Sequence, residues 1–223
     1  MAEILSVTTP EALDEVLDRA VEVLRSGGLV AFPTDTVYGV AAHAFVPKAV
    51  ARIYEAKRRP IDRAIPLLLA DPEDMEAVAK EIPPLAWELA RLFWPGPLTL
   101  VLPVHHRVPK EVVAGGDTVA VRIPDHMIPQ GLARLLHAPL ATTSANRSGG
   151  PDAITAQEVM DQIGADIDLI LDGGPCPGGV PSTVLDLTTD PPRLLRQGPI
   201  TRTMLADVLP DVCPLEENRR ARE

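Results

Sequence analysis

The residues with the clearest chemical potential are basic side chains near the ends of apolar segments. Lys57, Arg58 and Arg59 follow one another at the end of a predicted helix, and Arg63 stands close behind them. Cations at the carboxyl end of a helix can simply balance the helix dipole. This group exceeds that need, and in an acidic chain it favours a phosphate or carboxylate ligand. The spacing alone leaves both interpretations open.

Arg122 lies in a predicted strand, within the segment VAVRIP. The two-residue alternation places Val119 and Val121 on one face of the strand and Arg122 on the other. The guanidinium therefore either lies on a solvated sheet face or, at the strand end, pairs with a carboxylate or phosphate.

Two polar turns follow predicted strands, where open sheets place ligands. Thr34-Asp35-Thr36 follows 29–33, and Ser144-Ala145-Asn146 follows 139–143 and continues to a Gly-Gly pair at 149–150. The same residue types occur in ordinary turns, where their side chains bond nearby backbone amides. The glycines allow close backbone approach to an anion. A Gly/Pro-rich segment, 173–183, is either a structural crossover or a lid.

Several common catalytic signatures are absent from the sequence. It has no G-x-x-x-x-G-K-[ST] loop, no G-x-G-x-x-G fingerprint and no G-x-S-x-G segment. Any nucleotide binding is therefore not of the Walker kind. The five histidines lack metalloenzyme spacing, and the two cysteines, Cys176 and Cys213, are too few for a disulfide framework.

The composition is typical of a soluble globular protein. The 223 residues are 46% hydrophobic and 23% charged, with a formal net charge of −10. A chain of this length buries roughly 70% of its unfolded surface, so it needs no disulfide or structural metal to fold. The first residues lack a signal-peptide pattern, and no apolar run reaches the roughly 20 residues of a membrane helix. We therefore expect a cytoplasmic protein without membrane contact.

Hydrophobic periodicity predicts a mixed α/β fold, in which helices cover a mixed rather than a doubly wound sheet. We expect one domain over residues 1–210 and a charged tail over 211–223. The first predicted helix starts within 8–11 and ends at 24, and another helix opens at 71. The other predicted helices cover 47–59, 128–137, 155–163 and 201–209. The predicted strands are 4–7, 29–33, 65–70, 98–103, 118–124, 139–143, 167–172, 182–187 and 194–197.

Seven segments taken together carry a resemblance to a known family. They are FPTDTVYGV (32–40), EAKRRP (55–60) with AIPLLLA (64–70), WPGPLTLVL (94–102), VAVRIP (119–124), TSANRSGGP (143–151), PSTVLDL (181–187) and LLRQGPI (194–200). They occur in the order of the YrdC/TsaC family of L-threonylcarbamoyladenylate synthases, which the chain resembles over most of its length. Each motif alone is weak, but all of them in register are specific.

The resemblance implies an enzyme, a nucleotidyltransferase that forms threonylcarbamoyl-AMP and pyrophosphate from L-threonine, bicarbonate and ATP, with Mg²⁺ accompanying ATP. The product would feed the threonylcarbamoyladenosine modification of tRNA through a separate transferase complex. The family fold is a YrdC-like twisted mixed β-sheet flanked by helices, with a concave basic pocket. This chain is similar to the short, single-domain form.

The resemblance also implies roles for particular residues. Lys57 and Arg59 match a K-x-R pair expected on the ATP phosphates, and they are the predicted catalytic residues. The further ATP-binding residues implied are Thr118, Ser144, Asn146 and Arg196. The threonine-binding residues implied are Thr34, Arg122, which would hold the carboxylate, and Ser182. Two departures are visible: Pro181 stands where the family often has Glu, and Asp152-Ala153-Ile154 replaces the commoner S-P-T, so no role is assigned there.

The implied reaction brings two anions together, and such catalysis depends on positioning and electrostatics more than on a proton-transferring base. Segment 173–182 is the candidate to close over the labile carbamate.

One alternative function is that of a non-enzymatic RNA-binding or ribosome-maturation module. The net charge of −10 and the 3% aromatic content argue against it and against direct tRNA binding. Another is a carbamoyl-transfer domain like those of hydrogenase maturation proteins, which work beside zinc-finger segments that this chain lacks.

Overall fold

The computed structural model describes residues 1–7, 10–177, 179–206 and 208–209. Its helices are α1 (Pro10–Arg25), α2 (Pro47–Lys57), α3 (Met75–Val78), α4 (Pro84–Phe93), α5 (Met127–Leu136), α6 (Ala156–Ile163) and α7 (Arg202–Ala206), with a 3₁₀ turn, η1, at Pro72–Asp74. Its strands are β1 (Glu3–Ser6), β2 (Val30–Phe32), β3 (Gly39–His43), β4 (Leu67–Leu68), β5 (Leu98–Pro103), β6 (Thr118–Arg122), β7 (Leu140–Ser144), β8 (Leu169–Asp172), β9 (Thr183–Asp186) and β10 (Arg193–Arg196).

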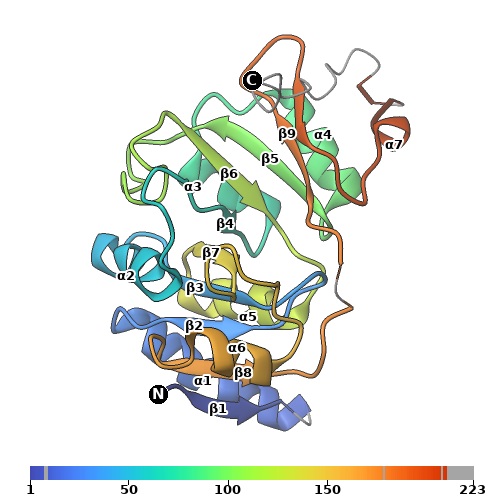
Figure 1. Ribbon diagram of the computed structural model, residues 1–223. Helices are drawn as coiled ribbons and strands as arrows, with labels where there is room; N and C mark the ends of the chain where they lie inside the picture. Colours follow the sequence, from blue (N-terminus) through green and yellow to red (C-terminus); the bar gives the residue numbers. More distant parts are fainter. Residues whose placement is uncertain (8–9, 178, 207, 210–223) are drawn as a thin grey trace, which may run out of the picture.

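These strands form one mixed sheet in the order β1-β8-β2-β3-β7-β4-β6-β5-β9-β10. β8 pairs in parallel with both β1 and β2, whereas β3 and β7 run antiparallel to their neighbours in the middle of the sheet. Figure 1 shows α1, α5 and α6 gathered around the lower strands, and α3 and α4 beside the upper ones. The expected mixed α/β fold is therefore confirmed.

The two faces of the sheet are covered by different helices because buried side chains alternate along the strands. Val30 and Phe32 of β2 pack with α1 and α5, whereas Ala31 packs in the larger core that contains α2 and α6. Helix α1 supplies the spacing that this packing needs, since its buried residues recur every three or four positions: Val16, Leu17, Ala20, Val21 and Leu24.

The same alternation creates an unfilled face in the upper part of the sheet. The even-numbered leucines of β5, such as Leu98 and Leu100, pack into the core with α3 and α4. Thr99 lies between them on the strand and faces the opposite side, as do Ala120 and Arg122 of β6. The sheet therefore offers polar side chains to a hollow at this position.

Some elements differ from the sequence-based expectation. Strand β3 was not predicted, and the strand expected over 65–70 contains only Leu67–Leu68. The helix expected to open at 71 is divided: α3 ends before Ala79, which is extended and bridges to Val104, and α4 begins at Pro84. The helix expected over 47–59 ends at Lys57, because Arg58 adopts a left-handed conformation with φ of 52°.

Two expectations lie outside the described residues: the helix start at Thr8-Thr9 and the charged tail over 211–223. In the part of the chain that is described, no helix combines the length and the apolar character needed to cross a membrane.

Candidate functional site

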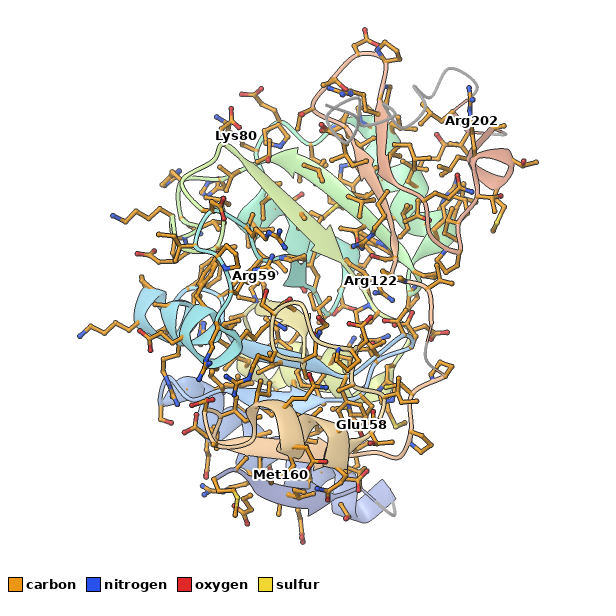
Figure 2. All side chains as sticks on the ribbon, in the orientation of Figure 1. Arg59, Lys80, Arg122, Glu158, Met160 and Arg202 are labelled. Carbon is orange, nitrogen blue, oxygen red and sulfur yellow. The ribbon has the colours of Figure 1, made fainter. Side chains whose placement is uncertain are left out.

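The candidate site is a pocket of about 490 Å³ over the middle of the sheet. It is bounded by the turn after β2, by strands β3, β4, β5, β6, β7 and β9, and by side chains from the segments after α2 and in β10. Figure 2 shows Arg59 and Arg122 in this central region, between the upper and lower strands. Six of the predicted site residues line it: Thr34, Arg59, Arg122, Ser144, Ser182 and Arg196.

Thr34 is held in its turn by its own hydroxyl. Oγ1 donates to the Val37 carbonyl at 2.7 Å and accepts from the Thr36 amide at 3.1 Å. The side chain is almost completely buried at the end of β2. Thr34 therefore both stabilises the turn and lines the pocket, so a structural role and a ligand-binding role are compatible at this residue.

Arg122 stands at the end of β6 in a nearly buried ion pair. Its Nε donates to the Gly96 carbonyl at 2.9 Å, and Nη2 lies 2.5 Å from each carboxylate oxygen of Asp35. Burial lowers the pKa of Arg122 and the charge of Asp35 opposes that shift. An arginine remains protonated in either case, so Arg122 brings a permanent positive charge to the pocket.

Ser144 and Asn146 form a compact loop with Lys57 beneath it. The Ser144 hydroxyl donates to Asn146 Oδ1 at 2.6 Å, and Asn146 Nδ2 donates to the Gly150 carbonyl at 2.8 Å. Lys57 Nζ donates to the backbone carbonyls of Ser144 and Asn146 and, at 3.1 Å, to Asn146 Oδ1. These bonds tie the end of α2 to the loop that follows β7.

Lys57 and Asn146 thus lie below the pocket surface rather than in its lining. Burial lowers the pKa of Lys57 to about 8; the charge of Arg59 adds to this effect and that of Asp152 opposes it. The hydrogen-bond donors of Lys57 are directed at the loop, because the loop carbonyls converge on Nζ. Its contact with ATP phosphates stays a prediction.

Arg59 reaches the pocket from the segment that follows α2. Its Nε donates to the Arg63 carbonyl at 3.2 Å and its Nη2 to the Ala64 carbonyl at 2.9 Å. Burial is the main influence on its pKa and lowers it. Helix α2 ends at Lys57 because the next residue, Arg58, is left-handed. As a result Lys57 lies under the Ser144–Asn146 loop, whereas Arg59 is directed into the pocket.

Ser182 is the centre of a polar group on the opposite wall. Its hydroxyl lies 2.8 Å from Thr99 Oγ1, and Arg196 donates to its carbonyl at 2.9 Å and to its hydroxyl at 3.1 Å. Burial and the nearby positive charge of Arg122 both lower the pKa of Arg196. Arg122 and Arg196 therefore face the same hollow as Arg59, and Asp35 pairs with Arg122.

Thr118 is separated from the other predicted residues. It opens β6 opposite Pro103, whereas Arg122 closes that strand, and Thr118 is not part of the pocket lining. Ala120 lies between them on the same face and does line the pocket. A nucleotide contact at Thr118 stays a prediction that requires the ligand to extend along β6.

Sequence reasoning assigned no individual role to several residues that shape the site. Asp35 holds Arg122, Thr99 holds Ser182, and Asp152 lines the pocket. Thr99 carried a detectable signal, because it is polar within the otherwise apolar strand LTLVL. Gly198 carried no such signal. A Cβ there would lie 2.2 Å from the Pro181 carbonyl oxygen, so the lack of a side chain lets the segment after β10 approach Ser182.

Tyr38 connects the pocket to the segment expected to close over it. Its hydroxyl donates to the Gly174 carbonyl at 2.8 Å, and the Cys176 amide donates to the Ile154 carbonyl at 2.8 Å. Burial raises the pKa of Tyr38, so that its hydroxyl keeps its proton. The first residues of segment 173–182 are therefore anchored, and closure by its later residues stays a prediction.

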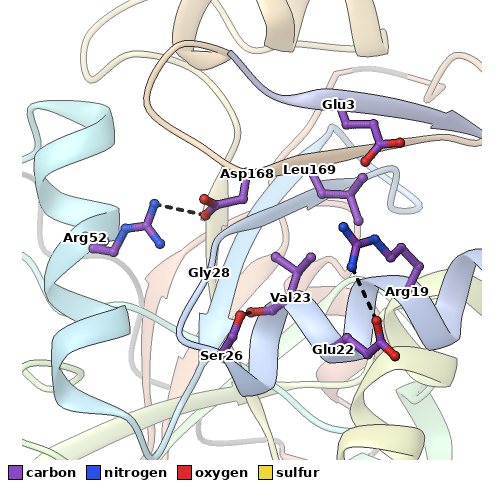
Figure 3. A pocket seen from close by; sticks show the side chains of 9 residues that line it. All are labelled: Glu3, Arg19, Glu22, Val23, Ser26, Gly28, Arg52, Asp168 and Leu169. Atoms are coloured by element: carbon purple, nitrogen blue, oxygen red, sulfur yellow. Dashed lines mark hydrogen bonds and ion pairs between the residues drawn. The ribbon is translucent and has the colours of Figure 1, made fainter.

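A second cavity, of about 520 Å³, lies near α1 and β8. Figure 3 shows that both arginines of this cavity face partners within it: Arg52 faces Asp168, and Arg19 faces Glu22. The Arg19–Glu22 pair is largely exposed to solvent, and the Arg52–Asp168 pair is partly exposed. Such pairs contribute little energy, and nothing in this cavity indicates a ligand.

Within the described ranges, no three histidine, cysteine, aspartate or glutamate side chains come together as a metal site. Magnesium is commonly held by substrate phosphates, water and one or two carboxylates. Among the residues that line the pocket, Asp152 is the one carboxylate. This donor set fits an Mg²⁺ ion that arrives with a nucleotide better than one held permanently by the protein.

Comparison with known proteins gives consistent matches. The model of the Sua5/YciO/YrdC family, described as telomere recombination, matches residues 22–198. The threonylcarbamoyl-AMP synthase of Pyrococcus abyssi is 48% identical over 189 residues, which cover 85% of this chain and 56% of that protein. A putative threonylcarbamoyl-AMP synthase of Mycobacterium tuberculosis is 36% identical over 209 residues, covering 94% and 96% of the two chains.

The crystal structure of P. abyssi Sua5 complexed with L-threonine superposes with a TM-score of 0.89 at 43% identity. It matches 96% of this chain, which spans 62% of that structure. The chain thus spans little more than half the length of the Pyrococcus protein.

Proposed function

The chain belongs to the Sua5/YciO/YrdC family, and from this membership we propose that it is an L-threonylcarbamoyladenylate synthase. The proposed substrates are L-threonine, bicarbonate and ATP, and the products are threonylcarbamoyl-AMP and pyrophosphate. The observation that carries the proposal is the convergence of Arg59, Arg122 and Arg196 on one pocket of an acidic chain. Its named relatives and the threonine-bound Sua5 structure support the choice of substrates.

The reaction requires two bond-forming steps. The amine of threonine adds to the carbon of bicarbonate, and loss of water leaves a carbamate. A carbamate oxygen then forms a bond to the α-phosphorus of ATP while the bond to the bridging oxygen of the β-phosphate breaks. The electron pair of that bond leaves with pyrophosphate, so negative charge grows on the leaving group.

The residues of the pocket have properties that suit these steps. We propose that Arg122, Thr34 and Ser182 bind threonine, with the guanidinium on its carboxylate. On the nucleotide side, Arg59 and Arg196 would balance the charge of the phosphates, and the loop containing Ser144 and Asn146 would hold them in place. Thr118 would contact ATP farther along β6. Lys57 would act mainly by holding that loop in place.

No side chain is required as a proton-transferring base after the carbamate has formed. Positioning the carbamate oxygen in line with the α-phosphorus supplies much of the acceleration in reactions of this type. Magnesium is proposed to enter as part of the Mg·ATP substrate and to neutralise phosphate charge. The later residues of 173–182 are proposed to close over the carbamate and exclude water.

The product is proposed to pass to a separate transferase complex that modifies tRNA. A net charge of −10 disfavours a sequence-independent grip on the phosphates of tRNA itself. The proposed place of the reaction is the cytoplasm.

The decisive experiment measures pyrophosphate release from ATP by the purified chain, and identifies the adenylate by mass spectrometry. We expect release only when L-threonine, bicarbonate and a divalent cation are all present. Omission of each in turn, and chelation of the cation, provide the controls. Release that does not depend on threonine, or binding of neither ATP nor threonine, would contradict the proposal.

A further inference from the structure

The guanidinium of Arg122 is held from one side by two anchors. Nε donates to the Gly96 carbonyl at 2.9 Å, and Nη2 lies 2.5 Å from both carboxylate oxygens of Asp35. The ion pair is nearly enclosed, since the side chains of Arg122 and Asp35 are 10% and 15% exposed. The guanidinium plane is therefore fixed by one backbone atom and one carboxylate.

The remaining nitrogen of this guanidinium is the part that a ligand reaches. Among the described residues, every fully buried side-chain nitrogen or oxygen has a hydrogen-bond partner. Nη1 of Arg122 has no partner among these residues, so it is not fully buried. Nη1 is consequently accessible. Because Arg122 lines the pocket, this accessible edge faces the space proposed for the substrate.

Asp35 itself stands behind the pocket surface. Its neighbours Thr34 and Thr36 line the pocket, whereas Asp35 does not. Both of its carboxylate oxygens lie 2.5 Å from Nη2 and accept hydrogen bonds from it. The hydrogen bonds of Asp35 therefore go to Arg122 rather than to a ligand in the pocket.

We propose that Asp35 is the positioning residue that sets the affinity of this pocket for the carboxylate of its amino-acid substrate. It does so by holding the Arg122 side chain in place, so that binding need not immobilise a flexible arginine. It also supplies the counter-charge that Arg122 needs beside the like-charged Arg196 when no ligand is bound. This inference rests on the proposed function, and deepens it by naming the residue behind the threonine site.

The test is a double-mutant cycle on threonine binding, with ATP binding measured in parallel by titration calorimetry. Asp35→Asn keeps the size of the side chain and one acceptor oxygen but removes the charge and the second acceptor. We expect it to weaken L-threonine binding by about ten-fold and to leave ATP binding unchanged. In an Arg122→Gln background, the same substitution is expected to have no further effect, because its influence passes through Arg122.

Asp71→Asn is the matched control. It removes the same charge from another arginine–carboxylate pair, with Arg134, which is exposed and does not line the pocket. It is expected to change neither affinity. Thermal unfolding of each variant separates a loss of fold from a loss of binding.

Three results would overturn the assignment of Asp35 alone: unchanged threonine binding in Asp35→Asn, equal weakening of threonine and ATP binding, or additive effects with Arg122→Gln. Failure of the unaltered chain to bind threonine would instead overturn the proposed function, and this assignment with it. The kinetic readout must agree, with a raised KM for threonine and a kcat close to that of the unaltered chain.

Discussion

At the scale of single residues, the most constrained side chain of the site is Lys57. It is an ammonium group with 2% of its surface exposed. Burying a charge is costly unless hydrogen bonds replace water. Here the carbonyls of Ser144 and Asn146 and the Asn146 side chain accept from it. Each hydrogen bond to a charged group contributes about 1.5–3 kcal/mol, which offsets the desolvation of the lysine.

Lys57→Ala is expected to lower the rate by about 10²-fold, which is the cost of misplacing reacting groups by about 1 Å. The physical reason is the loss of the charge and of the donors that shape the Ser144–Asn146 loop. The measurement is kcat/KM for pyrophosphate release, together with the Kd for ATP. Unchanged turnover in a folded Lys57→Ala variant would remove this residue from the mechanism.

The stability of the chain is expected to depend on pH through Lys57. Its pKa falls from 10.5 in the unfolded chain to about 8 in the fold. Between these values the unfolded state binds more protons, so stability rises with pH across that window. The gain from pH 8 to 10.5 is roughly 3 kcal/mol before other groups are considered.

Comparison with Lys57→Met isolates this effect, because the other titrating groups, such as Tyr38, are common to both proteins. Urea unfolding from pH 7.5 to 10.5 measures the difference. The unaltered chain should gain stability relative to the variant as pH rises. A difference that is constant with pH would contradict the lowered pKa.

The residues of the site were partly predictable from sequence, for identifiable reasons. Arg122 was identifiable because a charged residue interrupts an apolar strand, and strand alternation gives its face correctly. Lys57 and Arg59 were grouped by their spacing, yet a single left-handed residue between them sends them to different places. Asp35 was noted only as part of a polar turn, because its partner is 87 positions away in the chain.

At the scale of secondary structure elements, the approach of the segment after β10 to the start of β9 is decisive for the Ser182 wall. Gly198 donates its amide to Thr183 Oγ1 at 2.9 Å. A Cβ at this position would lie 2.5 Å from the Thr183 amide nitrogen and 2.7 Å from the Ser182 carbonyl carbon. These contacts are with backbone atoms, so a side chain at position 198 could be accommodated only if the backbone segment itself moved.

Gly198→Ala is therefore expected to destabilise the fold by about 1–3 kcal/mol, the usual range for overpacking. It is also expected to raise the KM for threonine, because Ser182 moves with its backbone. Chemical denaturation and steady-state kinetics provide the two measurements. Gly116→Ala is the control, since its Cβ meets only the Val113 carbonyl oxygen, at 3.1 Å. Equal stability of the two variants would show that the segment after β10 can shift at little cost in free energy.

The elements that escaped prediction were those whose formation depends on neighbours. Strand β3, with the sequence GVAAH, contains glycine and alanines, which have low strand propensity. It forms because β2 and β7 pair with it on both sides. Strand β4 has only two residues, although six apolar residues suggested a longer strand. By contrast α1, which has strong periodicity, was predicted closely.

At the scale of the whole molecule, the proposed binding site joins distant parts of one sheet. The pocket takes residues from the turn after β2 through to β10. A ligand in this pocket therefore contacts most of the strands at once, while the rest of the acidic surface repels anions. Binding and global stability should be strongly linked.

Mg·ATP and L-threonine together are expected to stabilise the protein against heat. At a concentration one hundred times its Kd, each ligand contributes about 2.7 kcal/mol by linkage. For a chain of this size, that corresponds to a rise in Tm of roughly 5–10 °C for each ligand, and the rise with both is expected to be larger. Differential scanning calorimetry with each ligand alone and with both provides the test. Chelation of Mg²⁺ should reduce the shift caused by ATP, and an unchanged Tm with all ligands present would contradict the location of the site.

The order of the strands also has a consequence for synthesis on the ribosome. Val30 of β2 pairs with Leu169 of β8, about 140 positions later in the chain. At ordinary translation rates of about 5–20 residues per second, β2 waits roughly 7–28 s for this neighbour. During that time one hydrogen-bonding edge of β2 has no strand beside it. Arg196, which also lines the pocket, is translated later still, so a nascent chain completes this lining only after residue 196 has been made.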